Sequence, residues 1–184
     1  QPQPEEARRQ EPVTREERLS ELLLALTCKF PAILEYLIDR LQVEQLKGDK
    51  CRNLYKNLVF YYNNNINSQN PDDYFDFDQF RQWFLANENQ EKTGSENEPN
   101  QSNFLNRLVI LGDEEYHQTE TDEARQEAIK LFTILKKRYL SQRMRDVEKM
   151  ISEAERDNDE AAVDNLMQEF QLLADEMREM GEEV

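Results

Sequence analysis

The sequence predicts an all-α protein, and three observations support this fold class. The 184 residues include only 4 Gly and 6 Pro, too few for a many-turned β architecture. Apolar residues recur at steps of three and four along several segments, the spacing of one helical face. The longest such segment, roughly 122–156, contains no Gly or Pro. We expect a small multi-helix globular subdomain over 14–139, then a long helix leading into a C-terminal antiparallel helical hairpin over 140–184.

The chain opens with a segment that we expect to be a flexible linker, residues 1–13. The stretch QPQPEEARRQEP combines Pro, Gln and charge, and its only apolar residue other than Pro is Ala7. Burial therefore cannot offset the entropy lost on ordering it. Thr14 and Glu17 then form a capping-box pattern ahead of LSELLLALTCKF. This pattern predicts a first helix that runs to about Phe30.

Two further helices are predicted before residue 66. Pro31 suits the first turn of the helix PAILEYLIDRL. Asp49 is a plausible cap for the next helix, which should end in the polar stretch NNNINSQNP. Its inward-facing side chains are expected to be Cys51, Leu54, Tyr55, Leu58, Val59 and Tyr62.

A fourth and a fifth helix complete the globular part. Asp76 or Asp78 can cap the fourth. Its four aromatic side chains are expected to fill most of the core: Phe77, Phe80, Trp83 and Phe84. Residues 87–101, NENQEKTGSENEPNQ, hold no large apolar residue, which predicts a mobile insertion. Ser102 should cap the fifth helix and Gly112 should end it.

The long helix is expected to open at Thr121 or Asp122 and to change character midway. Its first half carries a broad apolar face that suits a globular core: Ala128, Ile129, Leu131, Phe132, Leu135 and Tyr139. Its second half narrows to a seam with steps of four, three and four: Leu140, Met144, Val147 and Ile151.

The last helix carries a matching seam. The stretch VDNLMQEFQLLADEMREM repeats apolar residues at steps of three and four: Val163, Leu166, Phe170, Leu173, Met177 and Met180. The polar turn ERDND separates the two arms, with Asp159 as the expected cap of the second. Two narrow seams joined by a short turn predict an antiparallel hairpin in which the seams face each other.

A two-helix hairpin cannot cover its apolar side chains on all sides, so this one is expected to bind a partner. Met150, Met167 and Leu172 lie off the seams. Met adapts well to varied partner surfaces. We take these three residues, with Met177 and Met180 at the end of the helix, as the candidate partner-binding set. The alternative is that they are apolar residues scattered on an ordinary surface.

The composition restricts the classes of ligand and the compartment. With 23 Lys and Arg against 39 Asp and Glu, the formal net charge is -16. Such a field repels phosphate backbones and anionic lipids, so we expect no direct nucleic-acid binding and no membrane binding. The N-terminus lacks the layout of a signal peptide, which favours a cytoplasmic location. In that compartment Cys28 and Cys51, on predicted apolar faces, should be buried free thiols.

The sequence offers no catalytic constellation, and we expect neither a metal nor a cofactor in this chain. The only histidine, His117, lies in a polar stretch without cysteines at metal-ligand spacing, so we expect a solvated loop residue. The stretch DDYFDFD, 72–78, lacks the mid-loop Gly and terminal Glu of a calcium loop, and helix capping explains it better. Four scattered glycines cannot form a phosphate-binding loop.

The order of elements nevertheless resembles a known family. LSELLLALTCKFPAILEYL is similar to the opening helices, FDFDQFRQWFL to the middle helix, and the segment from KKRYLSQRMRDVEKM to the end of the last helix to the terminal hairpin of one domain. That domain is the C-terminal helicase-binding domain of bacterial DNA primase, the DnaG type. The resemblance covers about 16–180 and rests on the order of these segments, since none is an active-site signature.

The resemblance implies a non-enzymatic role: docking primase on the N-terminal domain of the hexameric replicative helicase (DnaB type), so that RNA primers are made at the replication fork. The parent would be a DNA-directed RNA polymerase with zinc and magnesium in upstream domains, tethered through the N-terminal linker. We expect a monomer in isolation. Two alternatives stay open, the N-terminal domain of the helicase itself and a non-replicative α-helical adaptor. The missing helicase-type opening stretch and the chain end GEEV favour the primase.

Overall fold

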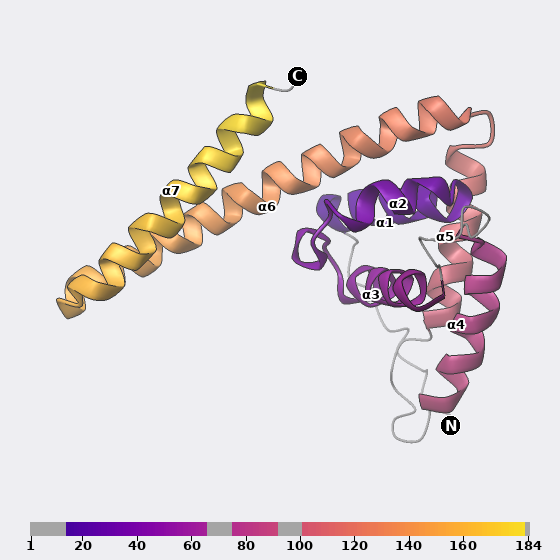
Figure 1. Ribbon diagram of the computed structural model, residues 1–184, viewed down its shortest axis with the longest axis horizontal. Helices are drawn as coiled ribbons and strands as arrows, with labels where there is room; N and C mark the ends of the chain where they lie inside the picture. Colours follow the sequence, from indigo (N-terminus) through magenta and orange to yellow (C-terminus); the bar gives the residue numbers. More distant parts are fainter. Residues whose placement is uncertain (1–13, 66–74, 92–100, 183–184) are drawn as a thin grey trace, which may run out of the picture.

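The computed structural model describes residues 14–65, 75–91 and 101–182, and every element in these ranges is helical. The fold class is therefore all-α, as the sequence predicts. A body of packed helices carries two long helices that project from it (Figure 1). The expectations for 1–13 and 92–100 lie outside the described residues.

Helix α1, Arg15–Lys29, occupies the centre of the body. The predicted capping box is present, because the Glu17 backbone N donates to Thr14 Oγ1 (3.2 Å) and the Thr14 backbone N donates to the Glu17 carboxylate (2.8 Å). Four consecutive residues of α1 are fully buried: Leu23, Leu24, Ala25 and Leu26. The helix packs against α2, α3, α5 and α6. A helix that is apolar all round must be covered on all sides, which explains its central place.

Helix α2, Ala32–Ile38, follows directly, and Pro31 lies in helical conformation at its start. It ends three residues before the predicted Leu41. A turn and a short 3₁₀ helix, η1, Val43–Gln45, replace the last predicted turn. Leu41 is still buried, and its carbonyl accepts a hydrogen bond from the Tyr55 hydroxyl (3.2 Å). The buried phenol thus fixes the end of α2 to α3.

Helix α3, Asp49–Asn65, begins at Asp49, so that residue is the first of the helix and not its cap. Gly48 precedes it with φ of +83°, a conformation that favours glycine.

The predicted inward face of α3 is correct at Cys51, Leu54, Tyr55 and Leu58. Val59 and Tyr62 are half-buried and pack against the core, and Tyr61, which lies outside the predicted set, is buried as well. The aromatic cluster explains this, because the Tyr61 ring packs against Phe75, Phe80 and Trp83.

Helix α4, Phe77–Glu91, is capped by Asp76, whose carboxylate accepts hydrogen bonds from the backbone N of Asp78 (2.8 Å) and Gln79 (3.1 Å). The expectation that its aromatics fill most of the core is wrong. Phe80 and Phe84 are buried, but Phe77 and Trp83 are half-buried at one edge. The leucines of α1 already occupy the centre. Residues 87–91 belong to α4, so the predicted loop 87–101 begins too early.

Helix α5, Gln101–Glu115, corrects three sequence predictions. Gln101 belongs to the helix and not to the predicted loop. Ser102 lies inside the helix and does not cap it. Gly112 does not end it either but is buried within it, where an added Cβ would lie 2.8 Å from the carbonyl O of Ala25. Glycine is needed here because α1 and α5 approach closely, which explains the choice better than a helix stop.

Helix α6, Thr121–Asp157, is continuous over 37 residues and opens at Thr121, one of the two predicted starts, with Glu120 at the N-cap position. Asn158 ends it in a left-handed conformation (φ 56°). Helix α7, Glu160–Glu182, then folds back along the distal half of α6 (Figure 1). Asp159 caps α7 as predicted, since its carboxylate accepts from the Ala162 backbone N (3.0 Å).

Candidate functional site: the helical hairpin

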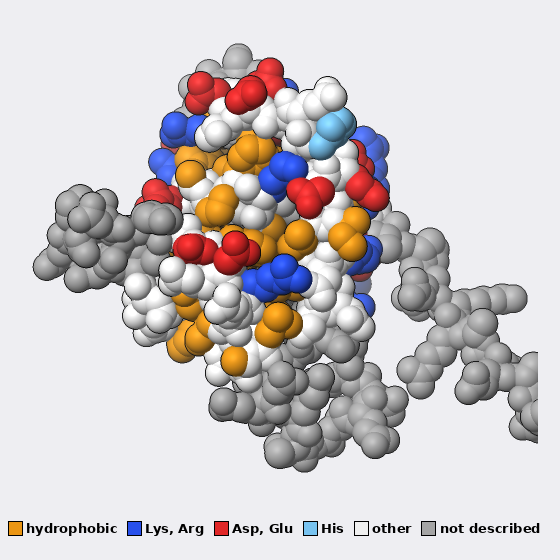
Figure 2. Space-filling view, turned by 90° about the vertical axis from the view of Figure 1, so that its right-hand side faces the viewer, with side chains coloured by type: hydrophobic (Ala, Val, Ile, Leu, Met, Phe, Trp, Pro, Cys, Tyr) orange, Lys and Arg blue, Asp and Glu red, His pale blue; other side chains and the backbone are white. Residues whose placement is uncertain are grey.

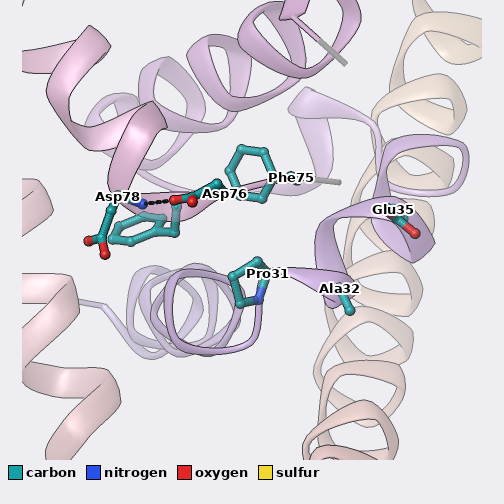
Figure 3. A pocket seen from close by; sticks show the side chains of 7 residues that line it. Pro31, Ala32, Glu35, Phe75, Asp76 and Asp78 are labelled. Carbon is teal, nitrogen blue, oxygen red and sulfur yellow. Dashed lines mark hydrogen bonds between the residues drawn. The ribbon is translucent and has the colours of Figure 1, made fainter. Parts of the chain in front are cut away.

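A cavity of about 380 Å³ lies between the first turn of α2 and the first turn of α4. Its walls are apolar, from Pro31, Ala32, Phe75 and Phe77, and carboxylates lie at its margin (Figure 3). Figure 3 shows that Glu35 and Asp78 point away from each other, and the Asp76 carboxylate is used to cap α4. The carboxylates do not converge, so the cavity lacks a pair of groups placed for acid–base chemistry.

A histidine and two cysteines are side chains of the kind that often take part in catalysis. His117 lies exposed in the turn after α5, as predicted, and Figure 2 shows the single histidine on the surface among mixed acidic, basic and hydrophobic side chains. Cys28 and Cys51 are buried free thiols, also as predicted. Burial raises the pKa of each thiol to about 12, so neither forms a thiolate near neutral pH.

Glu21 of α1 is a buried carboxylate, and its partners explain it structurally. It accepts a hydrogen bond from the Arg107 guanidinium of α5, and Arg18 lies 4.0 Å away. This pair joins the two central helices of the body. Within the described ranges, no group of three or more His, Cys, Asp or Glu residues is arranged to hold a metal ion. Of the described helices, none combines the length and the hydropathy that crossing a membrane requires.

The residues of the predicted hairpin seam are incompletely covered. Leu140 and Val147 of α6 are buried. The other six seam residues are half-buried: Met144, Ile151, Val163, Leu166, Phe170 and Leu173. Met177 and Met180 of α7 are half-buried as well. Two helices cover each other along one stripe only, so the flanks of the seam stay in contact with water.

Two ion pairs fix the register of the hairpin. Arg143 of α6 pairs with Glu169 of α7 (2.6 Å), and Lys136 pairs with Glu176 (2.7 Å). The residue numbers fall along α6 as they rise along α7, which shows that the arms are antiparallel. A third pair, Arg138 with Glu16 of α1 (2.6 Å), ties α6 to the body just before the hairpin begins. These contacts orient the hairpin relative to the body.

The three residues predicted to lie off the seam are exposed, but they do not form one surface. The exposed fractions are 42 % for Met150, 45 % for Met167 and 72 % for Leu172. Met167 and Leu172 are five residues apart on α7, which separates them by about 140° around the helix axis at 3.6 residues per turn. The candidate set therefore marks more than one face of the hairpin.

Sequence reasoning missed three other exposed apolar side chains, which lie on the body. They are Phe60 of α3, Ile110 of α5 and Ile134 of α6. Phe60 and Ile110 are each 58 % exposed, and the Phe60 ring stacks on Trp83 with centroids 5.9 Å apart. Each lies within one or two positions of a core residue on the same helix. Apolar periodicity alone does not separate such a residue from the buried face beside it.

Comparisons with protein-family models, with curated proteins and with solved structures found no match to this chain.

Proposed function

We propose that this chain is a protein-interaction domain, the helicase-binding domain of a bacterial DNA primase. In this proposal its hairpin docks on the N-terminal domain of the hexameric replicative helicase and brings primer synthesis to the fork. The observation that carries the proposal is the projecting α6–α7 hairpin with a half-buried seam and exposed Met and Leu side chains. Exposed apolar side chains on a protruding element are typical of a binding surface.

The rest of the molecule supports the same role. The buried core of the body continues onto α6, and the Arg138–Glu16 ion pair adds a contact at the base of the hairpin. The body can therefore set the angle at which the hairpin meets its partner. A net charge of -16 keeps a domain that works beside DNA from binding the phosphates itself. The resemblance in the order of the segments supplies the identity of the partner.

Calorimetric titration against the N-terminal domain of the cognate helicase tests the proposal. Met150→Lys, Met167→Lys and Leu172→Lys should leave the fold intact, because the parent side chains are exposed. A variant on the docking face should bind more weakly, since a partner would desolvate the new charge. Met167 and Leu172 lie on different faces of α7, so their variants also identify which face docks. Ile110→Lys on α5 is the matched control, and circular dichroism checks folding.

Three results would contradict the proposal. If all three hairpin variants and a chain lacking 140–184 bind as well as the parent, the hairpin is only a structural arm. If light scattering at micromolar concentration finds a stable dimer or hexamer in place of a monomer, the chain fits the N-terminal domain of the helicase better. A monomer that does not bind the helicase domain fits the α-helical adaptor.

A further inference from the structure

The outer face of α7 carries a second stripe, opposite the seam. Asp164, Gln168, Leu172, Asp175 and Glu179 follow one another at steps of four, four, three and four, which places them on one side of the helix. All five side chains are exposed. We call these five residues the outer stripe. Apart from α6, no other described element packs extensively on α7, so this stripe faces solvent.

Leu172 lies at the centre of the outer stripe. At 72 % it has the largest exposed fraction among the large hydrophobic side chains of the described residues. It contributes nothing to the seam with α6, because it lies on the other side of the helix. Covering an exposed leucine in the middle of a regular helix removes apolar surface from water, which favours binding of a partner at this position.

The carboxylates of α7 fall into two groups. Glu169 and Glu176 flank the seam and pair with Arg143 and Lys136 of α6. On the outer stripe, Asp175 pairs only with Arg178 of its own helix (2.9 Å). Asp164 and Glu179 form no ion pair with any residue of the described ranges. Glu169 and Glu176 are thus compensated by α6 and Asp175 by Arg178, whereas Asp164 and Glu179 are the uncompensated carboxylates of the outer stripe.

The position of these carboxylates along α7 also disfavours a purely structural role. A helix dipole favours cations in the last turns, yet α7 has no basic residue in its last turn. Of the outer stripe, Glu179 lies in this last turn, directly after Arg178, which pairs with Asp175. Acidic residues at this end lower the stability of an isolated helix, and a cation supplied by another molecule would offset that effect.

From the exposed Leu172, the uncompensated carboxylates and their place on the helix, we propose that the outer stripe binds a basic amphipathic helix of the partner protein. Lys or Arg side chains of that helix face Asp164, Asp175 and Glu179, and an apolar gap between them receives Leu172. This inference depends on the proposed function only for the identity of the partner. It adds the chemistry of the partner's contact helix and the face of α7 that it uses.

The test uses the whole chain with two charge changes that are equal in size. Asp164→Lys/Glu179→Lys alters the outer stripe, whereas Glu148→Lys/Glu153→Lys alters exposed positions on α6. We expect the outer-stripe variant to bind the helicase N-terminal domain at least about tenfold more weakly, and the control to change binding less than about threefold. Raising the salt concentration should weaken binding of the parent more than binding of the outer-stripe variant. Leu172→Ala should weaken binding without changing the salt dependence.

A second probe separates failure of this inference from failure of the proposed function. A synthetic amphipathic helix of Lys and Leu, compared with one of Glu and Leu, is titrated into the isotope-labelled chain. The basic peptide should shift the amide resonances of 164–179, and the outer-stripe variant should abolish these shifts. If the helicase domain fails to bind but the peptide shifts these resonances, the proposed function is wrong and the inference holds. If the helicase domain binds both charge variants equally, or the basic peptide leaves 164–179 unshifted, the inference is overturned.

Discussion

The body buries its apolar side chains more completely than the hairpin does. In the body, α1 is surrounded by α2, α3, α5 and α6, and its central leucines are fully buried. In the hairpin, α7 packs on α6 alone, and most seam side chains remain half-buried. The body has a further layer of helices that the hairpin lacks, and two helices alone cover only one stripe of each other. The body can therefore fold without a partner, whereas the hairpin keeps apolar surface in contact with water.

Ion pairs also have different roles in the body and in the hairpin. In the body, ion pairs join helices that are already packed, as in the Lys29–Asp113 pair between α1 and α5 (2.8 Å). In the hairpin, Arg143–Glu169 and Lys136–Glu176 supply part of the specificity for register that a narrow seam does not provide. Exposed pairs are worth little each, so their contribution is to select one alignment of the arms rather than to hold them together.

The largest expected effect is a cavity in the centre of the body. Leu24→Ala removes a side chain that is 0 % exposed in the middle of α1. We expect a loss of about 3 to 5 kcal/mol in the free energy of unfolding, because the surrounding helices cannot collapse into the gap. Urea denaturation followed by circular dichroism measures this loss. A loss below about 1 kcal/mol would contradict the contrast between body and hairpin.

A smaller effect is expected where two body helices approach most closely. Gly112→Ala places a methyl group 2.8 Å from the carbonyl O of Ala25, so α1 and α5 must move apart. We expect a loss of about 1 to 3 kcal/mol, in the range for overpacked interiors. Higher helix propensity would predict stabilisation instead, and a variant more stable than the parent in thermal unfolding would show that the close approach is not rigid.

Truncation in the hairpin should cost less than truncation in the body. Phe170→Ala removes a half-buried ring from the seam of α7, and we expect a loss of about 1 to 2 kcal/mol. The loss should be local. Hydrogen exchange should accelerate along α7 and the distal half of α6, while the amides of α1 keep their protection. Equal acceleration in α1 would show that body and hairpin unfold as one unit.

The smallest expected effect concerns register. Arg143→Glu places like charges opposite Glu169, and the double variant with Glu169→Arg restores an opposite pair. Both parent side chains are more than a third exposed, so we expect a coupling free energy of no more than about 1 kcal/mol. A double-mutant cycle in thermal unfolding gives this coupling. No coupling would mean that the seam alone sets the alignment of the arms.

Sequence patterns predicted the ends of helices correctly where a local motif has only one structural interpretation. Thr14 with Glu17 marked the start of α1, and Asp159 marked the start of α7. The heptad-like spacing left Met150, Met167 and Leu172 outside the predicted seams, and all three are exposed. Gly112 was misread because a glycine in a helix pattern can be a stop or a contact point. Only the neighbouring helix distinguishes the two.

By itself, the sequence determined the helical class and the continuous long helix, because periodicity and capping are properties of neighbouring residues along the chain. The tertiary structure alone decided that α1, and not the aromatics of α4, forms the centre of the core. It also decided that Gly112 lies against Ala25 and that the side chains of the predicted seam stay only half-buried. These features depend on how many helices surround each side chain, and that number is set by contacts between residues far apart in the sequence.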